Sequence, residues 1–138
     1  MNDPGRIVLL IIDDNPTDRV TYRRYLEQVS GDYEVHEAED IKTGLDAAHR
    51  VKPDCVLLDL MLNHESGFEL LNALIEHTSQ LQLPVIMLTG ASWVPLKDAA
   101  MKLGARAYLR KGHIDAAQLD RTIREVVENK LGGEICED

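Results

Sequence analysis

The 138-residue sequence has little of what several common protein classes need. It contains only two cysteines, Cys55 and Cys136, which lie far apart in the sequence. We interpret them as a buried residue and a tail thiol in a reducing compartment. No basic region followed by an apolar core opens the chain, so no secretory signal is predicted. No apolar run approaches the length that spans a bilayer. These absences predict a cytoplasmic protein.

Positive charge is scarce as well. The chain carries 15 Lys and Arg against 24 Asp and Glu, a formal net charge of −9. A nucleic-acid surface needs clustered basic residues that displace counterions from phosphates, and an anionic membrane attracts the same residues. The charge balance therefore argues against both kinds of partner and favours proteins or cations.

Familiar catalytic patterns are also missing. The sequence has no Gly-rich phosphate loop, and neither G-x-S-x-G nor G-x-G-x-x-G occurs. The five histidines show no metal-ligand spacing, so we interpret them as surface or partly buried groups and not as zinc ligands.

The sequence does contain short apolar runs that alternate with helical patterns. Runs at residues 7–12, 55–58 and 84–88, with weaker candidates at 33–39 and 105–109, predict five strands. Apolar residues at helical spacing follow the strands, as at Tyr22, Tyr25, Leu26 and Val29, and at Leu96, Ala99, Ala100 and Leu103. Five strand-helix units in a row predict an α/β fold with a doubly wound parallel sheet and helices on both faces.

Helix starts are marked by capping signals. Asn15 and Pro16 match the N-cap and first position of the first helix. Asp115 and Gln118 have the spacing of a capping box before the last helix. The third helix is expected at about residues 66–78. Nothing interrupts this organisation until residues 132–138, which form a loose acidic tail behind a domain at 1–131.

Polar residues follow the predicted strands at one rim of the sheet. Both common doubly wound arrangements place a site at the carboxyl ends of the strands, and in the flavodoxin-like order 2-1-3-4-5 it lies between the first and third. Asp13 and Asp14 follow the first strand, Asp59 the third, Thr89 the fourth and Lys111 the fifth. Any one of them alone is more often an ordinary loop or surface residue, so the prediction depends on their coincidence.

This set of groups predicts phosphoryl chemistry. Clustered carboxylates raise one another's pKa unless a cation neutralises them, and oxygen ligands suit Mg²⁺. A carboxylate beside such an ion can attack phosphorus and form an aspartyl phosphate. Thr89 and Lys111 would supply a hydroxyl and an ammonium to the phosphoryl oxygens.

At this point the sequence resembles the receiver domain of two-component response regulators. The motifs are LLIIDDN, VLLDLMLNHESG with Gly67 eight residues after Asp59, VIMLTGA and GARAYLRKG. The resemblance runs from about residue 6 to 130 and implies the flavodoxin-like strand order. It implies that the protein is a phosphorylated relay or switch and not a turnover enzyme.

The resemblance also assigns roles at the site. Asp59 would be the phosphoacceptor, supplied by a histidine kinase or a phosphotransfer protein. Mg²⁺ would be held by Asp14 directly, by Asp13 largely through water, by Asp59 and by the backbone carbonyl of Met61.

Activation would involve three further residues. Thr89 resembles the switch hydroxyl that moves to the phosphoryl group, while Lys111 contacts it. Tyr108 matches the aromatic residue that turns inward on activation. The face of the fourth helix, fifth strand and fifth helix would then bind a downstream protein, and a homodimer through the fourth-helix face stays open.

Two residues depart from the family pattern. Gly112 follows Lys111 where receivers usually have a proline, commonly after a cis bond. A cis bond before a non-proline residue costs about 3 kcal/mol, so we predict a trans bond or a remodelled loop. Asn63 also replaces a usual proline and is expected to loosen the loop beside Asp59.

Two other functions remain as alternatives. One is a Mg²⁺-dependent phosphohydrolase acting on a small substrate, although no cap insertion or substrate pocket is evident. The other is a pseudo-receiver that binds its partner without phosphorylation, which Gly112 keeps open. The chain is either a stand-alone receiver or a receiver cut from a larger regulator or kinase.

Overall fold

The computed structural model describes residues 6–62, 65–77, 83–90 and 94–128. The expectations for Asn63, Cys136 and the tail at 132–138 lie outside these described residues.

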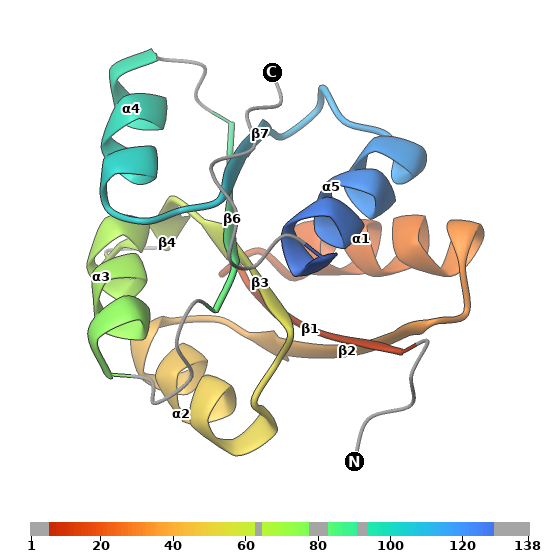
Figure 1. Cartoon of the computed structure of the whole chain (residues 1–138), viewed down its shortest axis with the longest axis horizontal. Coiled ribbons are helices and arrows are strands. Elements are labelled where there is room, and N and C mark those ends of the chain that lie inside the picture. The colour runs from red at the N-terminus through yellow and green to blue at the C-terminus, as the bar shows by residue number, and fades with distance from the viewer. Residues whose placement is uncertain (1–5, 63–64, 78–82, 91–93, 129–138) are drawn as a thin grey trace.

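One parallel sheet forms the centre of the fold (Figure 1). Its strands are β1 (Ile7–Ile12), β2 (Tyr33–Ala38), β3 (Cys55–Asp59), β6 (Val85–Thr89) and β7 (Ala107–Arg110). They pair in the order β2-β1-β3-β6-β7, each neighbour parallel to the next. Counted along this sheet the order is 2-1-3-4-5, which confirms the predicted flavodoxin-like arrangement.

Helices cover both faces of the sheet (Figure 1). They are α1 (Pro16–Val29), α2 (Ile41–Val51), α3 (Gly67–His77), α4 (Val94–Lys102) and α5 (Ala116–Glu128). Alternate strand residues divide the core in two, since Leu9 and Ile11 pack with α1 and α5 while Leu10 and Ile12 pack with α2, α3 and α4. β1, β3 and β6 are buried on both faces, which is why their sequences are continuously apolar.

The predicted capping residues Asn15 and Asp115 each accept a hydrogen bond at the start of a helix. The Asn15 side chain accepts a hydrogen bond from the backbone N–H of Thr17 at 2.9 Å, and Pro16 begins α1. The Asp115 carboxylate accepts one from the N–H of Gln118 at 2.8 Å. Each cap satisfies a backbone donor that the first turn of a helix leaves without an internal partner.

The predicted apolar faces are shorter than expected at their ends. Tyr22 and Leu26 are buried beneath α1, whereas Val29 at its last position is 39% exposed. Leu103 is 40% exposed because α4 already ends at Lys102, while Ala100 is buried. Helical spacing therefore identified the packed face but not where each helix stops.

A small antiparallel pair, β4 (Met61–Leu62) with β5 (Glu65–Ser66), was not predicted. Strands of two residues are too short to show a period of alternation. The pair lies between Asp59 and α3, so it shapes the chain next to the predicted phosphoacceptor.

Among the described helices, none combines the length and apolar character needed to cross a membrane.

Candidate metal centre

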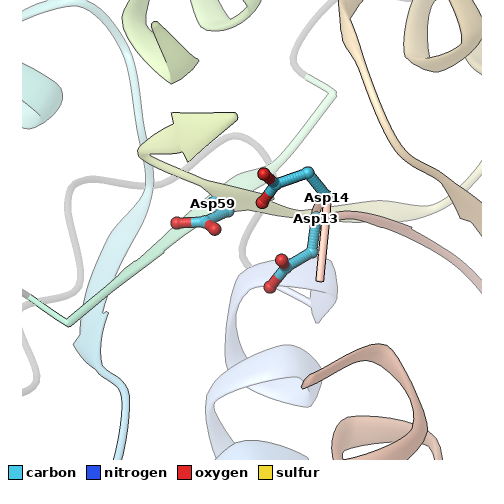
Figure 2. A group of neighbouring side chains, drawn as sticks. All are labelled: Asp13, Asp14 and Asp59. Carbon is cyan, nitrogen blue, oxygen red and sulfur yellow. The ribbon is translucent and has the colours of Figure 1, made fainter. Parts of the chain in front are cut away.

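Three carboxylates meet where β1 and β3 end (Figure 2). The two strands are neighbours, with Ile12 paired with Leu58, so the residues that follow lie side by side. One oxygen each from Asp13, Asp14 and Asp59 lies within 4.8 Å of the others. The structure therefore brings together the three acidic residues that the sequence predicted from separate strand ends.

The protein backbone holds two of these carboxylates in place. Asp13 is 1% exposed, and its Oδ1 accepts a hydrogen bond from the N–H of Asn15 at 2.9 Å. Asp59 is 6% exposed, and its Oδ1 accepts one from the N–H of Met61 at 3.2 Å. Asp14 is partly exposed, and no described residue donates a hydrogen bond to its carboxylate. Asp14 thus has oxygen atoms available for a cation.

Lys111 joins this cluster from the carboxyl end of β7, at the same rim of the sheet. Its backbone N–H bonds to the carbonyl of Thr89 at 2.8 Å, which ties the residue to the end of β6. Its Nζ donates to Asp13 Oδ2 at 2.9 Å and to Asp59 Oδ2 at 3.0 Å. A third bond, at 2.8 Å, goes to Asp18 Oδ2 in the first turn of α1.

Asp18 was not among the predicted site residues. An acidic residue in the first turn of a helix is usually explained by its interaction with the helix dipole. The available signal was its place in the first turn of α1, the helix that begins at Pro16 two residues after Asp14. That place puts it near the rim, but only the packing of α1 on α5 and the sheet shows that it reaches Lys111.

The loop after Lys111 agrees with the prediction for Gly112. No cis peptide bond occurs among the described residues, so the Lys111-Gly112 bond is trans. Gly112 has a φ of 81°, a left-handed conformation that glycine adopts without strain. Lys111 reaches Asp59 even though no proline follows it.

The cluster has more carboxylates than ammonium groups, since it brings Asp13, Asp14, Asp18 and Asp59 together with Lys111. Burial, and then the neighbouring charge of Asp13, raise the pKa of Asp59 to about 6, while Lys111 opposes this shift. Burial alone would lower the pKa of Lys111, but its bonds to Asp18, Asp13 and Asp59 outweigh burial and raise it. Excess negative charge and an all-oxygen donor set fit a hard divalent cation such as Mg²⁺.

Comparison with known proteins identifies the family. A family model described as the response regulator receiver domain matches residues 9–124. The chain belongs to this receiver-domain family. It is also 32% identical to Protein PilH of Pseudomonas aeruginosa over 119 residues, covering 86% of the chain and 96% of PilH.

Other relatives are longer proteins. The nitrate/nitrite response regulator protein NarP of Escherichia coli is 35% identical over 103 residues, which are 75% of this chain and 47% of NarP. Histidine kinase P4 of Formosa agariphila is 27% identical over 131 residues, covering 95% of this chain and only 9% of the kinase. The chain thus spans nearly all of PilH but less than half of NarP and of the histidine kinase.

Solved structures agree with the fold. A CheY-like response regulator receiver domain protein from Methanospirillum hungatei has a TM-score of 0.79 at 25% identity, covering 91% of this chain and 97% of that one. A putative response regulator from Chloroflexus aurantiacus has a TM-score of 0.81 at 26% identity, covering 89% and 98%.

The predicted switch residues of this receiver are both buried. Thr89 ends β6 with 1% exposure, one strand away from Asp59. Tyr108 on β7 is 4% exposed and packs in the core cluster shared with α4. Tyr108 therefore occupies an inward position, the one that the resemblance associates with activation.

Met61 and Gly67 complete the surroundings of Asp59. The Met61 side chain is 63% exposed, while its backbone N–H bonds to Asp59. Gly67 begins α3, and its backbone N–H donates a hydrogen bond to the carbonyl oxygen of Leu60, with 2.6 Å between nitrogen and oxygen. A Cβ at Gly67 would lie 2.3 Å from the Asp59 carbonyl, so only glycine allows α3 to start this close to the predicted phosphoacceptor.

Proposed function

We propose that this receiver accepts a phosphoryl group on Asp59 and uses it to change its protein-binding surface. The observation that best supports the proposal is the contact of Lys111 with Asp59, inside a cluster that also brings Asp13 and Asp14 within 4.8 Å of the same carboxylate. A nucleophile, an ammonium and two further carboxylates then share one rim of the sheet.

The transfer would proceed by attack of an Asp59 oxygen on the phosphorus of a phosphohistidine. The new O–P bond forms as the P–N bond breaks, and the donor imidazole leaves with the electron pair. Lys111 and Thr89 would donate hydrogen bonds to the phosphoryl oxygens, where negative charge concentrates. The donor would be a histidine kinase or a phosphotransfer protein.

Asp13, Asp14, Asp59 and the backbone carbonyl of Met61 would hold Mg²⁺. When bound, the ion would neutralise charge on the carboxylates and on the phosphoryl oxygens. Asp14 would be the most available ligand because its carboxylate is partly exposed, whereas Asp13 is already bonded to Asn15 and Lys111.

The signal would leave through the face formed by α4, β7 and α5. A phosphoryl group on Asp59 adds charge and acceptors that attract Thr89 and Lys111. Movement of Thr89 would favour the inward position of Tyr108, and a downstream protein would bind the resulting surface. Such a domain assists only its own phosphorylation and dephosphorylation and is not a turnover enzyme.

The test is intact mass after incubation with acetyl phosphate, with Mg²⁺ or with EDTA. We expect a Mg²⁺-dependent gain of one phosphoryl group that Asp59→Asn abolishes. Asp46→Asn is the matched control, because it removes one exposed carboxylate from α2 and should leave the gain unchanged. A gain that persists in Asp59→Asn would place the acceptor elsewhere, and steady release of phosphate from small esters would favour a phosphohydrolase.

A further inference from the structure

Asp18 makes a contact that the proposed phosphotransfer does not explain by itself. Its Oδ2 lies 2.8 Å from Lys111 Nζ, the shortest of the three ion pairs that Lys111 forms among the described residues. The Asp18 side chain is 31% exposed, against 2% for Asp13 and 7% for Asp59. Asp18 therefore binds the ammonium from the solvent side of the rim.

Of the three carboxylates that Lys111 contacts, two have other roles in the proposed phosphorylation and one does not. A lysine ammonium has three N–H donors, and here each has one carboxylate partner. In the proposed function, Asp59 must carry the phosphoryl group, while Asp13 serves the metal. Asp18 is not part of the group of carboxylates that could hold an ion among the described residues. It is the partner that Lys111 can keep throughout the reaction.

The helical turn that carries Asp18 is fixed to the sheet. Asp18 sits in the first turn of α1, two residues after Pro16, which follows the Asn15 cap. Its neighbour Arg19 bonds both to the backbone carbonyl of Asp13 and to Glu37, at 2.7 Å for the latter. This turn is therefore tied to the ends of β1 and β2.

Lys111, in contrast, has fewer restraints on its carboxyl-terminal side. The next residue is Gly112, which is exposed and lacks the ring that fixes φ in a proline. A long lysine side chain loses rotamer freedom when it is held in one position, so each fixed partner helps to keep it there.

We propose that Asp18 is a positioning residue for Lys111, holding its ammonium at the rim where it can donate to a phosphoryl group on Asp59. This inference rests on the proposed function and adds to it a residue outside the predicted site. Asp18 touches neither the acceptor nor the metal ligands in this role and acts only through Lys111.

The test is a double-mutant cycle on the rate of phosphorylation by acetyl phosphate, followed by intact mass. We expect Asp18→Asn to slow the wild-type rate by about fivefold, the scale of one partly exposed ion pair. In a Lys111→Met background the same change should have no further effect, because its target is gone. Asp46→Asn, which removes the same charge at a distance, should leave the rate unchanged. An unchanged rate in Asp18→Asn, or an equal slowing in the Lys111→Met background, would overturn the proposal.

A second measurement separates this inference from the proposed function. The ¹⁵N signal of the Lys111 ammonium, assigned by its loss in Lys111→Met, should shift in metal-free Asp18→Asn and stay in place in Asp46→Asn. If the wild type is never phosphorylated, the proposed function fails. A shifted signal would then still support the positioning contact, and an unshifted signal would overturn it as well.

Discussion

Replacing Asp59 with asparagine should stabilise the metal-free protein at neutral pH. Asp59 is 6% exposed and lies beside Asp13, and these two conditions raise its pKa from 3.8 to about 6 even with Lys111 in contact. A shift of about two units corresponds to roughly 3 kcal/mol of folding free energy lost at pH 7.5 when the carboxylate ionises. Asparagine keeps nearly the same shape without the charge, so most of this loss should be recovered.

The stability that Asp59→Asn gains over the wild type should increase as pH rises. Below the unfolded-state pKa of 3.8 the carboxyl is protonated in both states, and no penalty exists. Between 3.8 and about 6 the unfolded state ionises first, so stability of the wild type falls as pH rises. The advantage of the variant should therefore shrink from about 3 kcal/mol at pH 7.5 to about half of that at pH 5.0.

Urea unfolding in EDTA at these two pH values would measure the effect, with Asp46→Asn as the control for loss of one surface charge. That control should change stability by less than about 0.5 kcal/mol. Adding Mg²⁺ should reduce the difference in unfolding free energy between Asp59→Asn and the wild type, since a ligand that binds the folded wild type stabilises it by mass action. A less stable Asp59→Asn at pH 7.5, or a gain that is larger at pH 5.0, would refute the reasoning.

Three further substitutions test separate parts of the structure. Gly67→Ala should destabilise the protein by about 1–3 kcal/mol and slow phosphorylation, because its Cβ would lie 2.3 Å from the Asp59 carbonyl; unchanged urea unfolding would contradict this. Gly112→Pro should cost about 2 kcal/mol or more in the same assay, since a φ of 81° is closed to proline, and a more stable variant would disprove it. Tyr33→Phe removes a 2.6 Å hydrogen bond to Asp120 far from the rim, so it should cost about 1 kcal/mol and leave the phosphorylation rate as it is; a slower rate would reveal an unexpected connection.

The sheet could be predicted because its strands are buried on both faces. Burial from both sides forces continuous apolar runs such as residues 7–12, and these runs appear in the sequence without any knowledge of their partners. The order of the strands required the family resemblance. The two-residue strands β4 and β5 carry no such pattern, because their pairing depends on how the chain turns between Asp59 and Gly67.

The rim could be predicted for a similar reason. In a parallel sheet, residues directly after the strands meet at one edge, so Asp13, Asp14 and Asp59 were expected together and lie together. The raised pKa of Asp59 also follows from this meeting, since burial and the neighbouring carboxylate of Asp13 both disfavour its charged form. The burial of Tyr108 could not be foreseen, because an aromatic residue on an edge strand can point either way.

Asp18 shows what strand-end reasoning leaves out. A residue in the first turn of a helix projects in a direction set by how that helix packs, and α1 packs against α5 and the sheet through Tyr22 and Leu26. That packing brings Asp18 to Lys111, 93 residues later in the chain. The groups at the strand ends follow from topology, while the residue that we propose holds the lysine in place follows from the packing of one helix. The absence of a proline after Lys111 therefore removes a restraint on the loop, and the ion pair with Asp18 supplies another from across the rim.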